Sequence, residues 1–113
     1  MKKVEAIIRR EKLQAVKEAL SKEGVIGLTV IEVKGRGEQG GITLEWRVGE
    51  YKVDILPKIK LEIVIEDELV NKVVEIICHS ARTGEVGDGK IFVSDILKVI
   101  KIRMGEELGY HKG

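Results

Sequence analysis

Apolar and polar residues alternate with two different periods along the chain, one typical of strands and one typical of helices. Residues 55–65 alternate between apolar and polar side chains, which predicts a strand. Shorter apolar stretches, rich in β-branched residues or bounded by charge, predict further strands at 3–9, 25–33 and 91–93, with a strand-like piece at 99–102.

Two other segments carry apolar residues at helical spacing. In residues 11–23 apolar side chains recur every three or four positions among Lys and Glu, and Gly24 is placed to end the helix. A second helix is predicted to start at Asp67, a favourable N-cap residue, and to continue through the apolar positions of 69–77.

The predicted order is strand, helix, strand, long loop, strand, helix, strand. Two βαβ halves of this kind fold as a split, ferredoxin-like unit. The expected fold class is therefore α+β, with residues 1–113 as a single domain. Because this scaffold carries many unrelated functions, the fold alone does not indicate an activity.

The pattern changes between residues 34 and 54, where five glycines interrupt polar and charged residues. This segment is too long for an ordinary turn, and long loops within compact domains are usually functional or disordered. Its aromatic residues, Trp46 and Tyr51, are suited either to anchoring a partner protein or to packing back onto their own domain.

Charge and cysteine content restrict the function classes. A formal net charge of +1 argues against a nucleic-acid-binding scaffold, which usually carries a strong basic excess. The single cysteine excludes a disulfide framework within one chain and fits a reducing cytosol. No apolar run reaches the roughly 20 residues that cross a bilayer, and the charged N-terminal stretch does not suit a signal peptide. A cytoplasmic protein is expected.

Residues 83–90, TGEVGDGK, carry the strongest local signal for chemistry. Glycines let backbone N–H groups approach an anion closely, and consecutive N–H groups can form an anion-binding nest. Lys90 adds a point charge suited to phosphate. The same pattern also fits a plain helix-to-strand turn with a solvated lysine.

A second glycine-rich segment, residues 34–41, follows a predicted strand. It fits either close approach of the backbone to a ligand or the flexible root of a long loop. Because strand and helix ends can converge in a ferredoxin-like unit, a phosphate pocket shared by both segments is a reasonable hypothesis.

Candidate catalytic groups are few. His79 lies near the end of an apolar helix, where a structural role is expected, and Cys78 beside it has no base at a useful spacing. Asp88 and Glu85 form a carboxylate pair on the glycine loop, but nothing marks either for acid–base chemistry.

Over essentially its whole length the sequence resembles the P-II family of nitrogen-regulatory signal proteins. Five stretches carry the resemblance, in the family's order: MKKVEAIIRREKL, TVIEVKGRG, EYKVDILPKIKLEIV, TGEVGDGKIFV and VIKIRMGE. The resemblance implies a ferredoxin-like fold, a homotrimer, and ATP or ADP bound in clefts between subunits. It also implies 2-oxoglutarate bound with Mg²⁺ beside ATP, and a long loop, residues 37–55, that grips target proteins.

The resemblance further implies individual site residues. One subunit would bind the nucleotide through the two glycine-rich segments, at Gly35, Arg36, Gly37, Gly87, Asp88, Gly89 and Lys90. A neighbouring subunit would add Thr29, Glu62, Val64, Lys101 and Arg103. 2-Oxoglutarate would contact Arg9, Gln39, Gly41, Lys58 and Gly87. Gln39 would also be a Mg²⁺ ligand through its amide oxygen, a donor that suits this hard cation.

The resemblance assigns output to the long loop and to no other segment. Trp46, Arg47 and Tyr51 would bind a target such as an ammonium channel, glutamine synthetase or another nitrogen-metabolism protein. A membrane would be reached only through a channel partner. Tyr51 also matches a tyrosine that is uridylylated in some bacterial relatives. Lys101 stands where relatives carry arginine, which keeps the charge but loses the planar fork. Residues 103–113 would form a C-terminal tail.

Two other functions stay open on the sequence. A slow ATPase or phosphoryl-transfer enzyme would use Lys90 and the glycine loops, but the sequence displays no evident water-positioning base or arginine clamp. A metal-tolerance relative of the same fold would bind ions in place of nucleotide, and would not be expected to carry the TGEVGDGK loop. The leading interpretation is a ligand-sensing signal protein rather than an enzyme.

Overall fold

The computed structural model describes residues 1–36, 42–46, 49–53 and 55–107. Its strands are β1 (Lys2–Ile8), β2 (Thr29–Gly35), β3 (Ile42–Trp46), β4 (Gly49–Val53), β5 (Leu56–Ile65), β6 (Lys90–Asp95), β7 (Ile100–Lys101) and β8 (Glu106–Glu107). Its α-helices are α1 (Leu13–Lys22) and α2 (Val70–Ala81), each preceded by a short 3-10 helix, Arg10–Lys12 and Asp67–Leu69.

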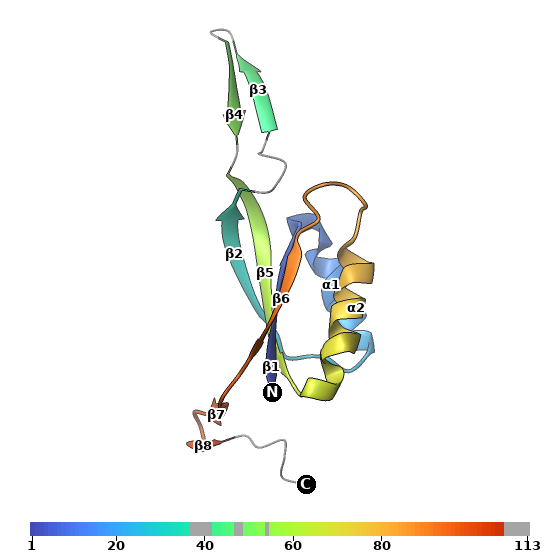
Figure 1. Ribbon diagram of the computed structural model, residues 1–113, viewed down its shortest axis with the longest axis vertical. Coiled ribbons are helices and arrows are strands. Elements are labelled where there is room, and N and C mark those ends of the chain that lie inside the picture. Colours follow the sequence, from blue (N-terminus) through green and yellow to red (C-terminus); the bar gives the residue numbers. More distant parts are fainter. Residues whose placement is uncertain (37–41, 47–48, 54, 108–113) are drawn as a thin grey trace.

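Four strands form one antiparallel sheet in the order β2-β5-β1-β6. This is the strand order of a ferredoxin-like fold, and it confirms the predicted α+β class. Both α-helices lie on the same face of this sheet (Figure 1). The opposite face is covered by neither helix.

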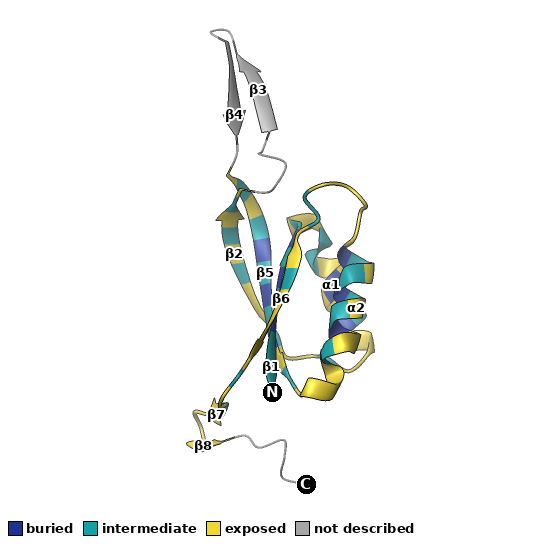
Figure 2. Cartoon of the chain, in the orientation of Figure 1, coloured by how far each residue is buried: buried dark blue, intermediate teal, exposed yellow. Residues whose placement is uncertain are grey.

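The alternation seen in the sequence sets which side chains meet the helices. In β1, Val4, Ala6 and Ile8 are buried, while the residues between them lie on the helix-free face. Ile59, Leu61 and Ile63 of β5 are buried in the same way, and Val4 lies opposite Ile63 in the register. The core therefore sits between the central strands and the helices (Figure 2).

Each helix contributes a narrow apolar stripe to this core. Val16 and Leu20 of α1 are buried, as are Val73, Ile77 and Ala81 of α2, at the spacing expected for one helix face. Truncating one of these buried side chains would leave a cavity and lower the stability of the fold.

Helix α1 ends as the sequence predicts. It stops at Lys22, and Gly24 follows with a φ of 84°, a conformation that glycine adopts readily. The Gly24 N–H donates to the Ser21 carbonyl at 3.0 Å and thereby satisfies one of the open carbonyls of the last turn.

The predicted start of the second helix is wrong in detail. Glu66 takes the extended N-cap conformation, and Asp67 already belongs to the 3-10 turn that precedes α2. The Asp67 carboxylate pairs instead with the Met1 ammonium group at 3.0 Å. A charged tertiary partner has displaced the local capping bond that the sequence favours.

Three other element boundaries differ from the predictions. The strand predicted at 25–33 starts only at Thr29, since Val25 is used in the turn after α1, where its N–H donates to Leu20. The long segment 34–54 is not simply a loop, because β3 and β4 pair as an antiparallel hairpin. The strand-like piece at 99–102 shortens to β7, which pairs with β8 inside the predicted tail.

Neither helix in the described part of the chain is long and apolar enough to cross a membrane.

Candidate functional site

The two glycine-rich segments meet at one end of the sheet, on its helix-free face. Gly35 ends β2 opposite Leu56, and Lys90 begins β6 opposite Ile7, so the register brings both segments to the same end. A cavity of about 390 Å³ lies between them, lined by Ile7, Gly35, Arg36, Lys58, Glu85, Val86, Gly87, Asp88, Gly89, Lys90 and Phe92. The predicted convergence of the two segments is confirmed.

The loop between α2 and β6 owes its shape to glycines at three positions. Gly84, Gly87 and Gly89 have φ angles of 90°, 102° and 107°, a region that other residues adopt only with strain. Gly89 is also pressed against β1, because a Cβ atom built there would lie 1.7 Å from the Ile7 carbonyl oxygen. Only glycine fits where β6 joins the sheet.

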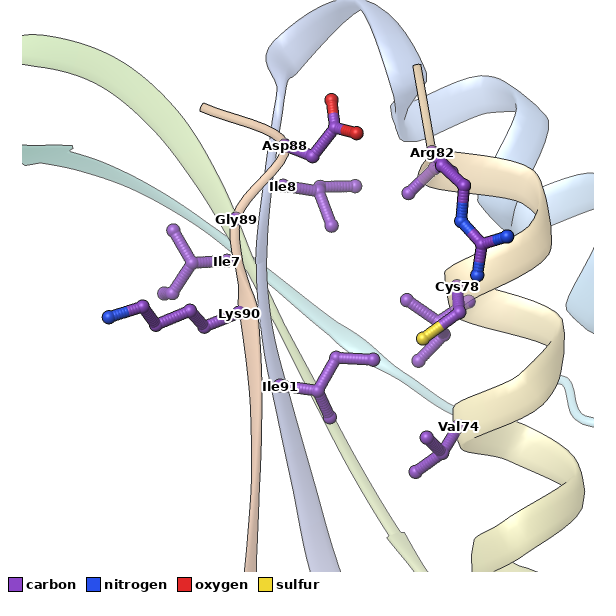
Figure 3. Close-up of a pocket in the computed structure, with 11 residues that line it drawn as sticks. Ile7, Ile8, Val74, Cys78, Arg82, Asp88, Gly89, Lys90 and Ile91 are labelled. Atoms are coloured by element: carbon purple, nitrogen blue, oxygen red, sulfur yellow. The ribbon is translucent and has the colours of Figure 1, made fainter. Parts of the chain in front are cut away.

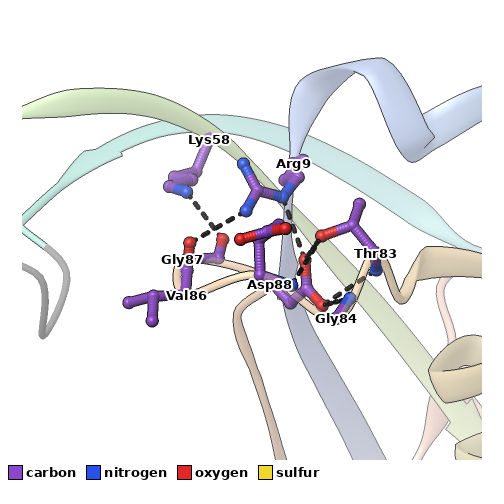
Figure 4. A network of polar contacts seen from close by, with 8 residues as sticks. Arg9, Lys58, Thr83, Gly84, Val86, Gly87 and Asp88 are labelled. Carbon is purple, nitrogen blue, oxygen red and sulfur yellow. Dashed lines mark hydrogen bonds and ion pairs between the residues drawn. The ribbon is translucent and has the colours of Figure 1, made fainter.

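The carboxylate of Asp88 is at the centre of the polar contacts in this loop (Figure 4). It accepts the Thr83 N–H at 2.8 Å, the Gly84 N–H at 2.9 Å, the Thr83 hydroxyl, and Arg9 Nε at 3.0 Å. These bonds, that of the Thr83 hydroxyl most of all, outweigh the opposing effect of burial and hold the pKa of Asp88 well below its ordinary range.

Two cationic side chains next to the 82–90 loop donate hydrogen bonds to its carbonyls. Lys58 Nζ donates to the Gly87 carbonyl at 3.0 Å, and an Arg9 Nη donates to the Val86 carbonyl at 2.9 Å. Arg9 comes from the end of β1 and Lys58 from β5, so the bonds attach the loop to the two central strands. In this structure both residues support the loop.

A smaller, apolar cavity of about 280 Å³ lies behind the loop, on the helix side. Val74, Cys78 and Ile91 point into it, whereas the Lys90 side chain points away from it, on the same side as Ile7 (Figure 3). This orientation follows from strand alternation, since Lys90 pairs with Ile7 and Ile91 pairs with the buried Ala6. Lys90 therefore lies with its side chain on the side of the larger cleft, which it lines.

The amino-acid sequence is matched by those of known proteins. The family described as Nitrogen regulatory protein P-II matches residues 1–106. "Nitrogen regulatory protein P-II 1" of Methanothermobacter thermautotrophicus is 56% identical over 106 residues, which cover 94% of this chain and 92% of the relative. The chain belongs to the P-II family. "Nitrogen regulatory protein P-II 1" of Escherichia coli strain K12 is 54% identical over 107 residues, covering 95% of this chain and 96% of the relative.

Within one P-II chain, part of the predicted nucleotide site lies away from the cleft. Thr29 and Glu62 face each other across β2 and β5, and Glu62 is four residues, or about 13 Å, along β5 from Lys58. Glu62 is instead paired with Lys3 at 3.9 Å and with Lys60 at 3.8 Å. Val64 lies still further along the same strand.

Lys101 and Arg103 are also remote from the glycine loop in this chain. Lys101 belongs to β7, and Arg103 lies in the turn that connects it to β8. That hairpin extends from the end of the sheet opposite the 82–90 loop (Figure 1). These two residues and Thr29, Glu62 and Val64 are the ones that the family resemblance assigns to a neighbouring subunit.

Some of the predicted site residues belong to the segment 37–55. Gly37, Gln39, Gly41 and Arg47 lie outside the described residues. Trp46 and Tyr51 fall within the backbone of the β3–β4 hairpin, where Trp46 pairs with Gly49 and Tyr51 with Leu44. Among the described residues, no cluster of three or more His, Cys, Asp or Glu side chains could hold a metal ion.

Thr83 organises the site although the sequence did not predict it as a site residue. Its hydroxyl donates to Asp88 and accepts the Glu85 N–H at 3.1 Å. A threonine next to a glycine and five residues before an aspartate is a weak signal, although Thr and Asp side chains are both known to close turns onto nearby backbone groups.

Proposed function

We propose that this P-II protein is a homotrimeric nitrogen-signalling protein that binds ATP or ADP in the cleft between the two glycine-rich segments. The observation that carries the proposal is the convergence of Gly35, Arg36 and residues 85–90 around one cavity that Lys58 also lines. Phosphate groups bind where backbone N–H groups and fixed positive charge meet. The regulatory names of the two relatives support the signalling role.

The charge balance of the cleft favours an anionic ligand. Arg36, Lys58 and Lys90 line it together with Glu85 and Asp88. The negative charge of Asp88 is compensated by Arg9, whose Nε lies 3.0 Å from the carboxylate. Among the described lining residues three side chains are cationic and two are anionic, a composition that suits a di- or triphosphate.

Binding itself is tested by calorimetric titration of the wild-type protein with ADP and with ATP. Saturable binding of one nucleotide per chain is expected. Absence of heat and of competition between the two nucleotides up to millimolar concentration would show that the cleft has another role.

Assembly into a trimer would supply the residues that one chain keeps away from the cleft. The helix-free sheet face carries Phe92, 54% exposed, and Val64, 42% exposed, which are available to contact another copy. Between them Lys3 and Lys60 form ion pairs with Glu5 and Glu62 at 3.6–3.9 Å. Paired charges are easier to cover than single ones. Light scattering should give a mass near three chains.

The proposed co-ligands are Mg²⁺ and 2-oxoglutarate, at Gln39, Gly41, Gly87, Arg9 and Lys58. Arg9 and Lys58 now bond to loop carbonyls, so a dicarboxylate would have to exchange those partners for its own oxygens. Gln39 would join the metal, the γ-phosphate and 2-oxoglutarate, which makes binding of the ligands interdependent.

If Mg²⁺, ATP and 2-oxoglutarate share one site, the affinity for 2-oxoglutarate should depend on which nucleotide is bound. 2-Oxoglutarate should bind at least about fivefold more tightly with MgATP than with ADP, and it should tighten MgATP by the same factor because coupling is reciprocal. Gln39→Ala should abolish most of this factor, whereas Gln14→Ala on the exposed side of α1 should not. Equal 2-oxoglutarate affinity with ADP, with MgATP and without nucleotide would reject the scheme.

The proposed output is the segment 37–55, which carries Trp46, Arg47 and Tyr51 to a target such as an ammonium channel or glutamine synthetase. Because aromatic and arginine side chains are enriched at binding hot spots, Arg47→Ala should weaken binding of a channel target by about 30-fold or more. A pull-down should retain the channel with ADP and release it with MgATP and 2-oxoglutarate. Retention that no ligand alters would mean that the target or the output segment is different.

A further inference from the structure

Building on the nucleotide site proposed above, we propose that Thr83 and Asp88 are positioning residues of that site. Their side chains form a clasp that closes the loop before Gly89 and holds it in the shape that receives phosphate. Neither side chain contacts the ligand. The Thr83–Asp88 clasp is defined by three bonds, from the Thr83 N–H, the Thr83 hydroxyl and the Gly84 N–H to the Asp88 carboxylate.

The acceptor capacity of Asp88 is already used within the protein. An ionised carboxylate offers about four acceptor positions. Oδ1 receives the Thr83 hydroxyl and Arg9 Nε, and Oδ2 receives the N–H groups of Thr83 and Gly84. No position remains for a metal ion or a ligand hydroxyl, and a carboxylate repels phosphate. The role of Asp88 is therefore structural support of the loop.

The clasp also decides which part of the loop is left for an anion. The N–H groups of Thr83 and Gly84, which could have formed a nest for phosphate, are occupied by Asp88. The Glu85 N–H is occupied by the Thr83 hydroxyl. Phosphate is thereby directed to the later part of the loop, where Lys90 lines the cleft.

Arg9 connects the Thr83–Asp88 clasp to the sheet and neutralises the charge of the Asp88 carboxylate. Its guanidinium donates to Asp88 and to the Val86 carbonyl, on either side of Gly87. Arg9 follows β1 directly, so the loop is attached to a central strand of the core. Compensation of the carboxylate charge keeps Asp88 from opposing an anionic ligand nearby.

The clasp is closed at neutral pH. Because the pKa of Asp88 is lower in the folded protein than in the unfolded chain, its stabilising effect is complete above the unfolded pKa, about 4. The effect is lost only as the pH falls through the lower folded value. The groups facing the carboxylate are Thr83, Gly84 and Arg9.

The test compares Thr83→Val, which keeps the shape of the side chain but removes the hydroxyl, with Thr83→Ser, which restores it. Thr83→Val should weaken ADP binding about tenfold, and Thr83→Ser should bind within about twofold of wild type. Asp88→Asn, whose amide nitrogen cannot accept the bonds made to one carboxylate oxygen, should weaken binding at least as much as Thr83→Val.

Two further readouts separate positioning from direct contact and from general loss of structure. Thr83→Val should leave the salt dependence of ADP binding unchanged, whereas Lys90→Ala should reduce it, because Lys90 carries a charge and Thr83 does not. The exchange rates of the Thr83 and Gly84 amide protons should rise in Thr83→Val and Asp88→Asn, while the core amides of β1 and β5 stay protected.

The outcomes distinguish the clasp from the nucleotide site itself. If wild type binds ADP and Thr83→Val binds it equally well, or Thr83→Ser fails to restore affinity, the clasp proposal is overturned and the nucleotide site stands. If wild type binds neither ADP nor ATP, the nucleotide site is wrong and the positioning role falls with it. Faster exchange at the core amides would indicate a role in folding in place of positioning.

Discussion

Lys90→Ala should weaken ADP binding by roughly 10–150-fold, since a charge-assisted contact to phosphate is worth about 1.5–3 kcal/mol. Lys90 is exposed at the start of β6, and its side chain extends toward the cleft and away from the apolar cavity behind the loop. Its loss should therefore leave the packing of the sheet on the helices intact. Titration calorimetry on the folded variant measures the effect.

A matched control for Lys90→Ala is Lys17→Ala, which removes the same charge from an exposed position of α1. Alanine is at least as favourable in a helix as lysine, so this variant should fold and should bind ADP as wild type does. An equal loss in both variants would mean that only the net charge matters, and unchanged affinity in folded Lys90→Ala would place the phosphates elsewhere.

Gly89→Ala should destabilise the folded protein by about 3 kcal/mol or more, the largest effect expected of a single loop substitution. Two costs add at this position: a φ of 107°, which strains any residue with a Cβ atom, and a Cβ position 1.7 Å from the Ile7 carbonyl oxygen. The clash is with backbone, so relief requires separating β6 from β1. Urea unfolding measures the change.

Gly84→Ala provides the control, because Gly84 shares the positive φ, 90°, but has no neighbouring atom within 4 Å of the added Cβ. It should cost only about 1 kcal/mol. A similar loss of stability in both variants would indicate that conformational strain alone accounts for the glycine at position 89, and that close approach to β1 is unimportant.

The strands and helices that build the core could be predicted from the sequence because their burial is periodic. The alternation in residues 55–65 and the helical spacing in 11–23 correspond to β5 and α1 within a few residues. In these segments the side chains that face the core are apolar and those that face away from it are mostly polar, so the sequence shows the period of the element directly. The ferredoxin-like order follows once four strands and two helices are placed.

The β3–β4 and β7–β8 hairpins were not predicted because their strands pair with each other and not with the core sheet. Every residue of β7 and β8 is exposed, so these strands carry no alternation of buried and exposed positions. β7 and β8 have only two residues each. Glycines at 40, 41 and 49 further concealed the first hairpin within a segment that has loop composition.

The cleft was only partly predictable. The meeting of the two glycine-rich segments follows from the topology, because β2 ends and β6 begins at the same end of the sheet. The bonds from Thr83 to Asp88 depend on the φ angles of Gly84 and Gly87, which composition does not specify. The contribution predicted for Lys101 and Arg103 would come from a neighbouring copy, because the single chain places both away from the cleft.

Backbone amide NMR spectra recorded during titration with ADP test the central claim most directly, because they report where the phosphates bind. The largest shifts are expected at Gly87, Gly89 and Lys90, with further shifts at Gly35 and Arg36, the residues that line the cleft. Titration with ADP that leaves these five signals unchanged, while shifting signals of α1 or shifting none, would contradict the assignment of this cleft as the nucleotide site.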